Sequence, residues 1–350
     1  MAGGAGVRLW PLSRQRRPKQ VLRLFDHTSL LRHSYNRVAS LHDPQAICVI
    51  TTEDHRPAVE AELPELPPQN LFTEPVGRDS ANAVALAAAL LVKRDPEAVI
   101  GTFTADHMIS PLSSFRATIE RAYRAVEEHP DALVTMGVRP SRPDTNYGYI
   151  RRGERVSEGM YNAEKFTEKP NVAKAMKYLS SGEYYWNSGM FAWRGSTILS
   201  HVKRQIPQTY EAVCALADVW DSPDRTKRIR ELYPTLMKIS IDFAVMEQAQ
   251  KVLVVEMDAH WVDMGSWPAI ESMISADGEG NVSTSPDVVH LGSRGNIVVT
   301  EEKHLIATIG VDDLVIVHSP DATLICTKRD AAAIRELVEN IQNRYGEEYV

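Results

Sequence analysis

Cysteine is scarce in this sequence, and long hydrophobic runs are absent. Its 350 residues include only three cysteines, Cys48, Cys214 and Cys326, with no CxxC pair. This usage excludes a disulfide framework and favours a reducing compartment. The longest unbroken apolar run covers residues 83–92, far too short to cross a bilayer, and no apolar stretch follows Met1. We therefore expect a soluble cytoplasmic protein with neither a signal peptide nor a membrane partner.

Charge of one sign is not in large excess either. The chain has 39 Lys and Arg against 46 Asp and Glu, a net charge of −7, which argues against a nucleic-acid partner for the whole chain. Hydrophobic residues make up 43% and charged residues 24%, close to ordinary globular usage, so global disorder is excluded. A chain of this length can bury a large core without disulfide or metal staples, and it predicts two domains.

The first part of the chain alternates strand-like with helix-like segments. In one of the helical segments Ala83, Leu86, Ala87 and Leu90 recur at helical spacing and predict a buried helix face. Such alternation is typical of βαβ units, and it predicts an α/β fold with a Rossmann-like, mostly parallel sheet. We expect strands at residues 46–51, 70–73, 99–104 and 132–136, and helices at residues 54–63, 80–93 and 112–128.

The pattern changes from Asn281 onward. Short β-prone runs recur there with turns between them, and a helical pattern closes the chain. We therefore predict two domains, at residues 1–275 and 281–350, the second of which is small, β-rich and ends in a helix. The strands of this second domain are expected at residues 296–300, 304–309, 314–318 and 323–326, and the helix at residues 329–344.

A glycine-rich, basic segment stands at the start of the chain. It contains Gly3, Gly4 and Gly6, and six Lys or Arg residues precede the first acid, Asp26. Glycine-rich backbone can surround a phosphate with N–H groups, because a residue without a Cβ lets the phosphate come close. Neither the GxGxxG pattern nor a P-loop is present. These residues alone leave two interpretations open: a polyphosphate site, or a flexible N-terminus with a solvated basic run.

The segment GGAGVRLWPLSRQRRPKQ resembles the signature of the sugar-1-phosphate nucleotidyltransferases, GG-x-G-x-RL-x-PLS-R-x-x-x-PKQ. EPVGRDSANA, which begins at Glu74, is similar to the EPxGRNTAPA segment of the mannose-1-phosphate guanylyltransferases, and Ala105-Asp106-His107 is similar to their ADH motif. Eight motifs in the family's order cover nearly the whole chain, and the short, monofunctional members are the most similar. The other matching segments are NYGYI, FTEKP, WNSGMF, SIDFAVME and WVDMGSW, which begin at residues 146, 166, 186, 240 and 261.

This resemblance implies an enzyme that transfers GMP from GTP to α-D-mannose 1-phosphate, giving GDP-mannose and pyrophosphate, by Mg²⁺-assisted in-line attack on the α-phosphate. The attacking phosphate oxygen is already ionised, so such chemistry depends on positioning and charge stabilisation rather than on a general base. Two alternatives remain: the same chemistry with another hexose or heptose 1-phosphate or another nucleotide, and a non-catalytic regulatory homologue that binds a nucleotide sugar. The resemblance further implies a left-handed β-helix-like tail, and it leaves a homodimer open.

The resemblance also implies roles for individual residues. Asp106 follows an expected strand, where ligands usually bind, and with Asp263 it would hold one Mg²⁺ or, alternatively, Mn²⁺. His107 has no second histidine at ligand spacing, so we expect a structural or sugar-side neighbour of Asp106. The expected catalytic residues are Arg8, Lys19, Asp106 and Asp263; the nucleotide-binding residues are Gly3, Gly4, Gly6, Arg8, Glu74, Arg78 and Asp106; the sugar-phosphate-binding residues are Tyr147, Gly148, Glu168, Lys169 and Asn187.

Three points qualify these expectations. Glu168 and Lys169 have a simpler interpretation as a solvent-exposed ion pair. The family's glycine loop normally follows a hydrophobic strand, but here only Met1 and Ala2 precede it. We expect that strand to be missing, and we favour the hypothesis that the natural start lies upstream. Finally, Asp79-Ser80-Ala81-Asn82 replaces the usual NTAP, which bears on base selectivity more than on reaction type.

Overall fold

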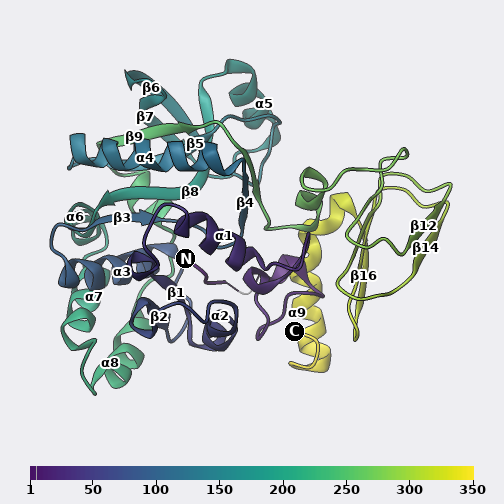
Figure 1. Ribbon diagram of the computed structural model, residues 1–350, viewed down its shortest axis with the longest axis horizontal. Helices are drawn as coiled ribbons and strands as arrows, with labels where there is room; N and C mark the ends of the chain where they lie inside the picture. The colour runs from purple at the N-terminus through teal and green to yellow at the C-terminus, as the bar shows by residue number, and fades with distance from the viewer. Residues whose placement is uncertain (5) are drawn as a thin grey trace.

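A large α/β unit and a smaller β-rich unit lie side by side, with helix α9 (Ile334–Tyr345) between them (Figure 1). This computed structural model describes residues 1–4 and 6–350, so Ala5 of the glycine-rich segment lies outside the described residues. Among the described helices, none is both long enough and apolar enough to cross a membrane. The arrangement confirms the expected α/β fold with a β-rich C-terminal unit that ends in a helix.

The main sheet of the large unit has six strands in the order β3-β8-β5-β9-β7-β6. Successive residues of a strand point to opposite faces, and here they join different clusters. Leu133 and Trp193 pack with α3, α6 and α7, whereas Val134 and Ala192 pack with α4. The strands are β3 (Val99–Thr102), β5 (Leu133–Val138), β6 (Tyr149–Ser157), β7 (Met160–Thr167), β8 (Tyr184–Arg194) and β9 (Val252–Met257). The helices are α1 (Leu30–Ala39), α2 (Arg56–Glu62), α3 (Ser80–Arg94), α4 (Leu112–Glu128), α5 (Val172–Ser181), α6 (Gly195–Gln205), α7 (Pro207–Val219) and α8 (Arg225–Leu232).

The strand directions in this sheet are mixed, which differs in detail from the mostly parallel sheet expected. β5 and β9 pair in parallel, but β8 runs antiparallel to both β3 and β5. β6 and β7 form an antiparallel hairpin. The expectation rested on the βαβ alternation before residue 136, whereas a short hairpin connection in the later part of the chain reverses the strand direction. The parallel pairing expected early in the chain is present between β1 (Val49–Thr52) and β2 (Leu71–Glu74).

The first two residues of the chain lie beside β1, where the sequence predicted a missing strand. The N–H of Ala2 donates to Ile50 O at 2.8 Å, and the N–H of Ala105 donates to Met1 O at 3.1 Å. β1 and β3 belong to different sheets, and both border a cavity of about 420 Å³. Phe72 is among the apolar side chains that line it. The missing strand itself stays a prediction.

The C-terminal unit is built from short parallel strands that stack on one another. β11 (Val282–Ser283), β13 (Ile297–Thr300) and β15 (Leu314–His318) form one ladder, and β12 (Val288–Leu291) pairs with β14 (Ile306–Ile309) in another. β16 (Thr323–Thr327) closes the first ladder in the antiparallel direction. The stacking also joins buried amides, because Asn296 Nδ2 donates to Asn281 Oδ1 at 3.0 Å. Parallel stacking of this kind is β-helix-like, as the family resemblance implied.

The N-terminal segment packs between the two units. Leu9 and Trp10 share one buried cluster with Trp267 of the large unit and with Val315 and Ile334 of the C-terminal unit. Because this cluster crosses the expected boundary between residues 275 and 281, the two units have a common core. The boundary itself stays a prediction.

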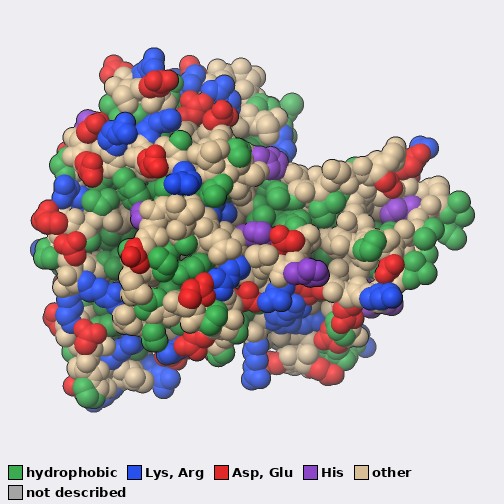
Figure 2. Space-filling model, in the orientation of Figure 1, with side chains coloured by type: hydrophobic (Ala, Val, Ile, Leu, Met, Phe, Trp, Pro, Cys, Tyr) green, Lys and Arg blue, Asp and Glu red, His purple; other side chains and the backbone are tan. Residues whose placement is uncertain are grey.

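The basic residues of the N-terminal segment do not all lie at one polyphosphate site. Arg14 pairs with Asp321 at 2.8 Å and Arg17 pairs with Glu301 at 2.5 Å, both across to the C-terminal unit. Over the face shown in Figure 2, Lys and Arg side chains are interspersed with Asp and Glu. Of these N-terminal cations, Arg8 and Lys19 are the ones that lie at the site described below.

Candidate active site

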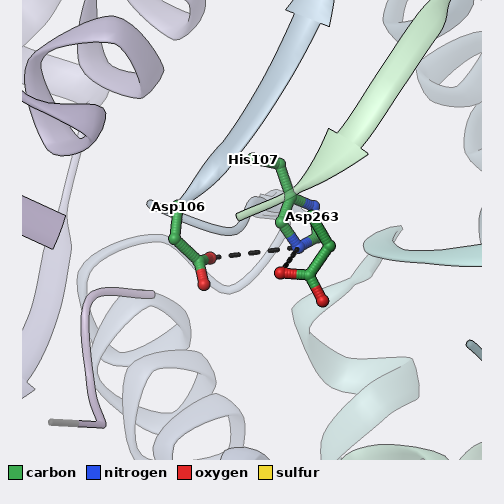
Figure 3. A group of neighbouring side chains, drawn as sticks. All are labelled: Asp106, His107 and Asp263. Carbon is green, nitrogen blue, oxygen red and sulfur yellow. Dashed lines mark ion pairs between the residues drawn. The ribbon is translucent and has the colours of Figure 1, made fainter. Parts of the chain in front are cut away.

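Two short antiparallel strands bring the expected metal carboxylates together. β4 (His107–Ser110) pairs with β10 (His260–Asp263), and the register places Asp263 opposite His107. Asp106 immediately precedes β4, so its side chain lies at the same end of this ladder. Figure 3 shows the side chains of Asp106, His107 and Asp263 converging from the two strands. The sequence indicated each carboxylate separately, and the pairing of β4 with β10 makes them neighbours.

The donor set of this cluster fits a divalent cation. One ligand atom from each of Asp106, His107 and Asp263 lies within 4.8 Å of the others. Asp263 Oδ1 is buried, and in the described part of the chain it has no hydrogen-bond partner. A buried carboxylate oxygen in this state is costly unless a ligand satisfies it. Carboxylate oxygens are the ligands that hard divalent cations prefer.

Lys19 reaches this cluster from the N-terminal segment. Its Nζ forms an ion pair with Asp106 Oδ2, and only 16% and 13% of the two side chains are exposed. Burial alone would lower the Lys19 pKa, but the carboxylates of Asp106 and Asp263 outweigh it and hold that pKa above its ordinary value. Burial likewise opposes ionisation of Asp106, but the Lys19 ammonium outweighs it and keeps the Asp106 pKa well below the usual range. Both groups therefore stay charged at neutral pH.

His107 is held in one tautomer by its neighbour Trp261. Trp261 Nε1 donates a hydrogen bond to His107 Nδ1 at 3.1 Å. An indole N–H can only donate, so Nδ1 carries no proton and the neutral ring has its proton on Nε2. Nε2 lies 3.9 Å from Asp106 Oδ1 and 3.7 Å from Asp263 Oδ1, as the dashed lines in Figure 3 show. His107 thus faces both carboxylates with an N–H group. Its expected role as a structural neighbour of Asp106 stays a prediction.

The glycine-rich loop lies directly against Lys19. Gly6 has φ 68°, and a Cβ at this position would lie 2.5 Å from Lys19 Cβ, so a larger residue would displace the lysine. Gly4 also has a positive φ of 89°. Gln20 Nε2 donates to Gly3 O at 2.7 Å and ties the loop to the segment that carries Lys19. The predicted phosphate loop and the predicted cation are therefore adjacent.

A pocket of about 270 Å³ opens beside Asp263, and Arg8 and Tyr147 are among its lining residues. Arg142 also lines it. Sequence reasoning missed Arg142, because a single arginine in a polar loop carries no distinctive signal. Its guanidinium pairs with Asp144 at 2.9 Å. The pocket thus combines two guanidinium groups, which suit a phosphate ligand, with the carboxylates of Asp144, Asp263 and Glu271, which suit an accompanying cation.

The other predicted sugar-side residues form a second cluster around Gly148, which follows Tyr147 in the chain. The N–H of Asn187 donates to Gly148 O at 2.8 Å, and a Cβ at Gly148 would collide with Glu168 Oε2. Lys169 Nζ pairs with Glu168 Oε1, which is the contact that the simpler ion-pair interpretation expects. However, the Glu168 side chain is only 16% exposed, whereas that of Lys169 is 60% exposed. Glu168 therefore points inward, toward Gly148.

Asp242 is a second residue that sequence reasoning missed. It lies in the SIDFAVME motif, which was noted only as a family match. Asn187 Nδ2 donates to Asp242 Oδ1 at 2.6 Å, so the carboxylate belongs to the sugar-side cluster. An aspartate inside an apolar stretch was the signal that could have indicated it.

Glu74 and Arg78 were both expected near the guanine base, but their side chains lie in environments that differ from each other. Glu74 is 4% exposed and accepts a hydrogen bond from the Tyr233 hydroxyl. Burial raises the pKa of Glu74 to about 7. A Cβ at Gly3 would lie 3.9 Å from Glu74 Oε2, so this carboxyl adjoins the glycine-rich loop. Arg78 instead donates through Nη2 to Pro234 O, beyond α8.

The DSAN departure from the family pattern has a local structural explanation. Asp79 has φ 68°, and its carboxylate accepts the Ser80 N–H at 2.7 Å at the start of α3. Asn82 is fully buried; its Nδ2 donates to Met237 O at 2.8 Å and its Oδ1 accepts from Thr209 Oγ1 at 2.9 Å. Asn82 therefore joins α3 to its neighbours rather than facing a ligand.

The chain is similar to known proteins in both of its units. The nucleotidyl transferase family model matches residues 1–279, and the model of the MannoseP isomerase/GMP-like beta-helix domain matches residues 286–341. The chain is 38% identical to a mannose-1-phosphate guanylyltransferase of Escherichia coli, over 100% of this chain and 74% of the relative. It is 35% identical to the xanthan biosynthesis protein XanB of Xanthomonas campestris pv. campestris, over 98% of this chain and 72% of the relative. A solved structure from Thermus thermophilus, described as a mannose-1-phosphate geranyltransferase, has a TM-score of 0.86 at 35% identity, covering 98% of this chain and 100% of that chain.

The chain belongs to the nucleotidyl transferase family. The fold and the site together define an enzyme that moves a nucleotidyl group, and its relatives confirm the resemblance to mannose-1-phosphate guanylyltransferases. Members of this family generally use a divalent metal ion, which agrees with the donor set of Asp106 and Asp263. The roles of single residues stay predictions.

Proposed function

We propose that this enzyme transfers GMP from GTP to α-D-mannose 1-phosphate and releases pyrophosphate. Three relatives that carry the name mannose-1-phosphate guanylyltransferase, one of them as putative, align over the whole chain at 37% or 38% identity. The observation that carries the proposal is the meeting of Lys19, Asp106 and Asp263 beside the glycine-rich loop. These groups come from three distant segments of the chain, as expected for a site built to hold polyphosphate.

In the proposed reaction, a phosphate oxygen of mannose 1-phosphate attacks the α-phosphorus of GTP. A new P–O bond forms as the bond from the α-phosphorus to the oxygen bridging to the β-phosphate breaks, and pyrophosphate leaves with that oxygen. Because the nucleophile is already an anion, the protein has to bring negative charges together and stabilise the charge that develops. The Lys19 ammonium neutralises charge on the α-phosphate, and the Arg8 guanidinium binds the triphosphate.

Asp106 and Asp263 would hold one Mg²⁺, with Mn²⁺ as the alternative. Such a cation neutralises phosphate charge and orients the phosphate groups when it is bound. The protein's own contribution is to present two carboxylates at the end of the β4–β10 ladder, where Asp263 Oδ1 is buried and lacks a partner among the described residues. His107 keeps an N–H group directed at both carboxylates.

The sugar side of the proposed site lies around Gly148. Glu168 points inward and can accept hydrogen bonds from sugar hydroxyls. The backbone N–H of Asn187 donates to Gly148 O, and Tyr147 forms part of the pocket wall. Lys169 is the proposed cation for the sugar phosphate. A buried acceptor that loses its hydroxyl partner costs about 1–3 kcal/mol, so this cluster can discriminate between epimers.

A pyrophosphate-release assay tests the proposal. The enzyme is given each pairing of GTP, ATP, UTP and dTTP with the 1-phosphates of mannose, glucose and galactose, with Mg²⁺ present, and the product is identified by mass spectrometry. We expect the highest kcat/KM for GTP with mannose 1-phosphate and no turnover in Asp263→Ala. A higher kcat/KM for another pairing would favour the alternative substrate. The absence of pyrophosphate from every pairing would favour the regulatory homologue.

A further inference from the structure

Asp242 starts a π-helical turn, Asp242–Met246, that α3 holds in place. The N–H of Ile241 donates to Ser80 Oγ at 2.9 Å, and the N–H of Ala81 donates to Ile239 O at 3.2 Å. π-helical turns are rare and frequently occur at functional sites. Both hydrogen bonds join α3 to backbone groups just before Asp242, so the start of the turn has a defined position.

The side chain of Asp242 faces Asn187 of β8. Asn187 Nδ2 donates to Asp242 Oδ1 at 2.6 Å, while Asn187 Oδ1 accepts the Gly189 N–H at 3.2 Å. These two bonds orient the amide, so its N–H₂ group points to the carboxylate. An ionised carboxylate can accept about four hydrogen bonds. Asn187 is the one side-chain donor to Asp242 within residues 1–4 and 6–350, so acceptor capacity remains.

A second carboxylate, that of Glu168, lies close to Asn187, because a Cβ at Gly148 would collide with Glu168 Oε2 and would lie 3.4 Å from Asn187 Cβ. Burial first, and then the Glu168 charge, raise the pKa of Asp242 to about 6, while the hydrogen bond from Asn187 and the charge of Lys169 oppose this shift. Two neighbouring carboxylates repel each other. If Asp242 served only to hold Asn187 in place, the nearby charge of Glu168 would be a cost without a benefit. A polyol ligand has hydroxyl donors for both carboxylates, because its adjacent hydroxyl groups are closely spaced.

We propose that Asp242 is a specificity-determining residue of the sugar-phosphate site. Its carboxylate accepts a hydrogen bond from a hexose hydroxyl adjacent to the hydroxyl that Glu168 accepts, and Asn187 holds it in this position. The inference rests on the proposed function and deepens it, because it assigns sugar recognition to the π-helical turn as well as to Glu168.

The test compares Asp242→Asn with Glu247→Gln, which removes an exposed acid that follows the same turn. Asp242→Asn keeps the size of the side chain and an oxygen for Asn187 Nδ2, but it loses the charge and part of the acceptor capacity. We expect the KM for mannose 1-phosphate to rise on the order of tenfold in Asp242→Asn, from the loss of one buried acceptor, with the Kd for GTP within about twofold. Glu247→Gln should leave both constants within about twofold of the parent enzyme.

Deoxy analogues of mannose 1-phosphate locate the contact. The parent enzyme should use two of the 2-, 3-, 4- and 6-deoxy compounds poorly, one for each carboxylate, and Asp242→Asn should lose nothing further with one of these two. A merely structural role would not produce this selective loss. If Asp242→Asn does not fold, Asp242→Glu replaces it, and we expect a changed ratio of kcat/KM for mannose 1-phosphate over glucose 1-phosphate.

The outcomes separate the two proposals. Suppose that the parent enzyme uses mannose 1-phosphate. If Asp242→Asn then keeps the parent KM for mannose 1-phosphate, or weakens the KM for this sugar and the Kd for GTP equally, the inference about Asp242 is overturned while the proposed function stands. If the parent uses no hexose 1-phosphate at all, the proposed function is overturned and the inference with it.

Discussion

Replacing Lys19 by Met separates the charge of this residue from its packing. The methionine keeps an unbranched apolar stem against Gly6, where the loop approaches Lys19 most closely, and it removes the ammonium from Asp106. The expected consequences are therefore electrostatic. One concerns stability, because a largely buried carboxylate loses its partner, and the other concerns the rate, because the α-phosphate loses a cation.

The magnitudes follow from the burial of the pair. Breaking a buried ion pair by removing one partner costs about 3–5 kcal/mol, and the lower end applies here because each side chain keeps some exposure, 16% for Lys19 and 13% for Asp106. Loss of one preorganised group that stabilises the transition state lowers kcat by about a hundredfold, or roughly 3 kcal/mol. An interaction made mainly in the transition state lowers kcat more than it raises KM.

Steady-state kinetics and urea unfolding measure the two effects on the same variant. Arg17→Met is a matched control, since it removes an exposed cation of the same segment that pairs with Glu301, away from the site. Mg²⁺ should restore part of the stability of Lys19→Met, because a second cation can neutralise Asp106. The reasoning is refuted if Lys19→Met changes KM alone and unfolds at the same urea concentration as the parent.

Three further predictions concern the metal, the buried glutamate and the sugar pocket. Asp263→Asn should abolish turnover without lowering the unfolding temperature, and EDTA should do the same to the parent enzyme; full activity without a divalent metal would contradict the assignment. Because burial raises the pKa of Glu74 to about 7 from 4.5, protonation at this site favours the folded state, and its contribution is lost as the pH rises through that interval. The free energy of unfolding should therefore fall by about 3 kcal/mol between these pH values, and Glu74→Gln should flatten the fall in urea titrations at several pH values; an unchanged slope would count against the buried acid. Glu168→Ala should strongly reduce kcat/KM for mannose 1-phosphate and leave the Kd for GTP unchanged, whereas a mere ion pair with Lys169 would cost under about 1 kcal/mol of stability and nothing in catalysis.

Much of the fold could be predicted because its signals are local. The expected helix at residues 112–128 coincides with α4, and the expected strand at residues 314–318 coincides with β15. The hydrophobic periodicity that predicts such helices and strands is visible within about a dozen residues, so it can be recognised without knowledge of distant contacts. The direction of β8 was not predictable in this way, since strand order and direction depend on partners that lie far apart in the chain.

The predicted site residues depended on the motif resemblance, and their surroundings did not follow from it. Arg142 was missed because a single arginine in a polar loop carries no distinctive signal, and Asp242 was missed because its motif was noted only as a family match. The N-terminal cations were interpreted together, as part of a polyphosphate site or of a solvated run, but Arg14 and Arg17 pair with acids of the C-terminal unit. Ion pairs of this kind join segments roughly 300 residues apart, beyond the reach of any local pattern.

The sequence by itself determined the types of elements, the glycine-rich loop and the identity of Lys19, Asp106 and Asp263, because residue chemistry and short-range periodicity are written in it directly. Only the tertiary structure decided that these three meet. The antiparallel register of β4 with β10 sets Asp263 opposite His107, and the close approach of the loop at Gly6 brings Lys19 to Asp106. The physical reason is that strand pairing and core packing depend on contacts throughout the folded chain. These contacts set the distances between the residues of a catalytic site, and no local sequence pattern contains them.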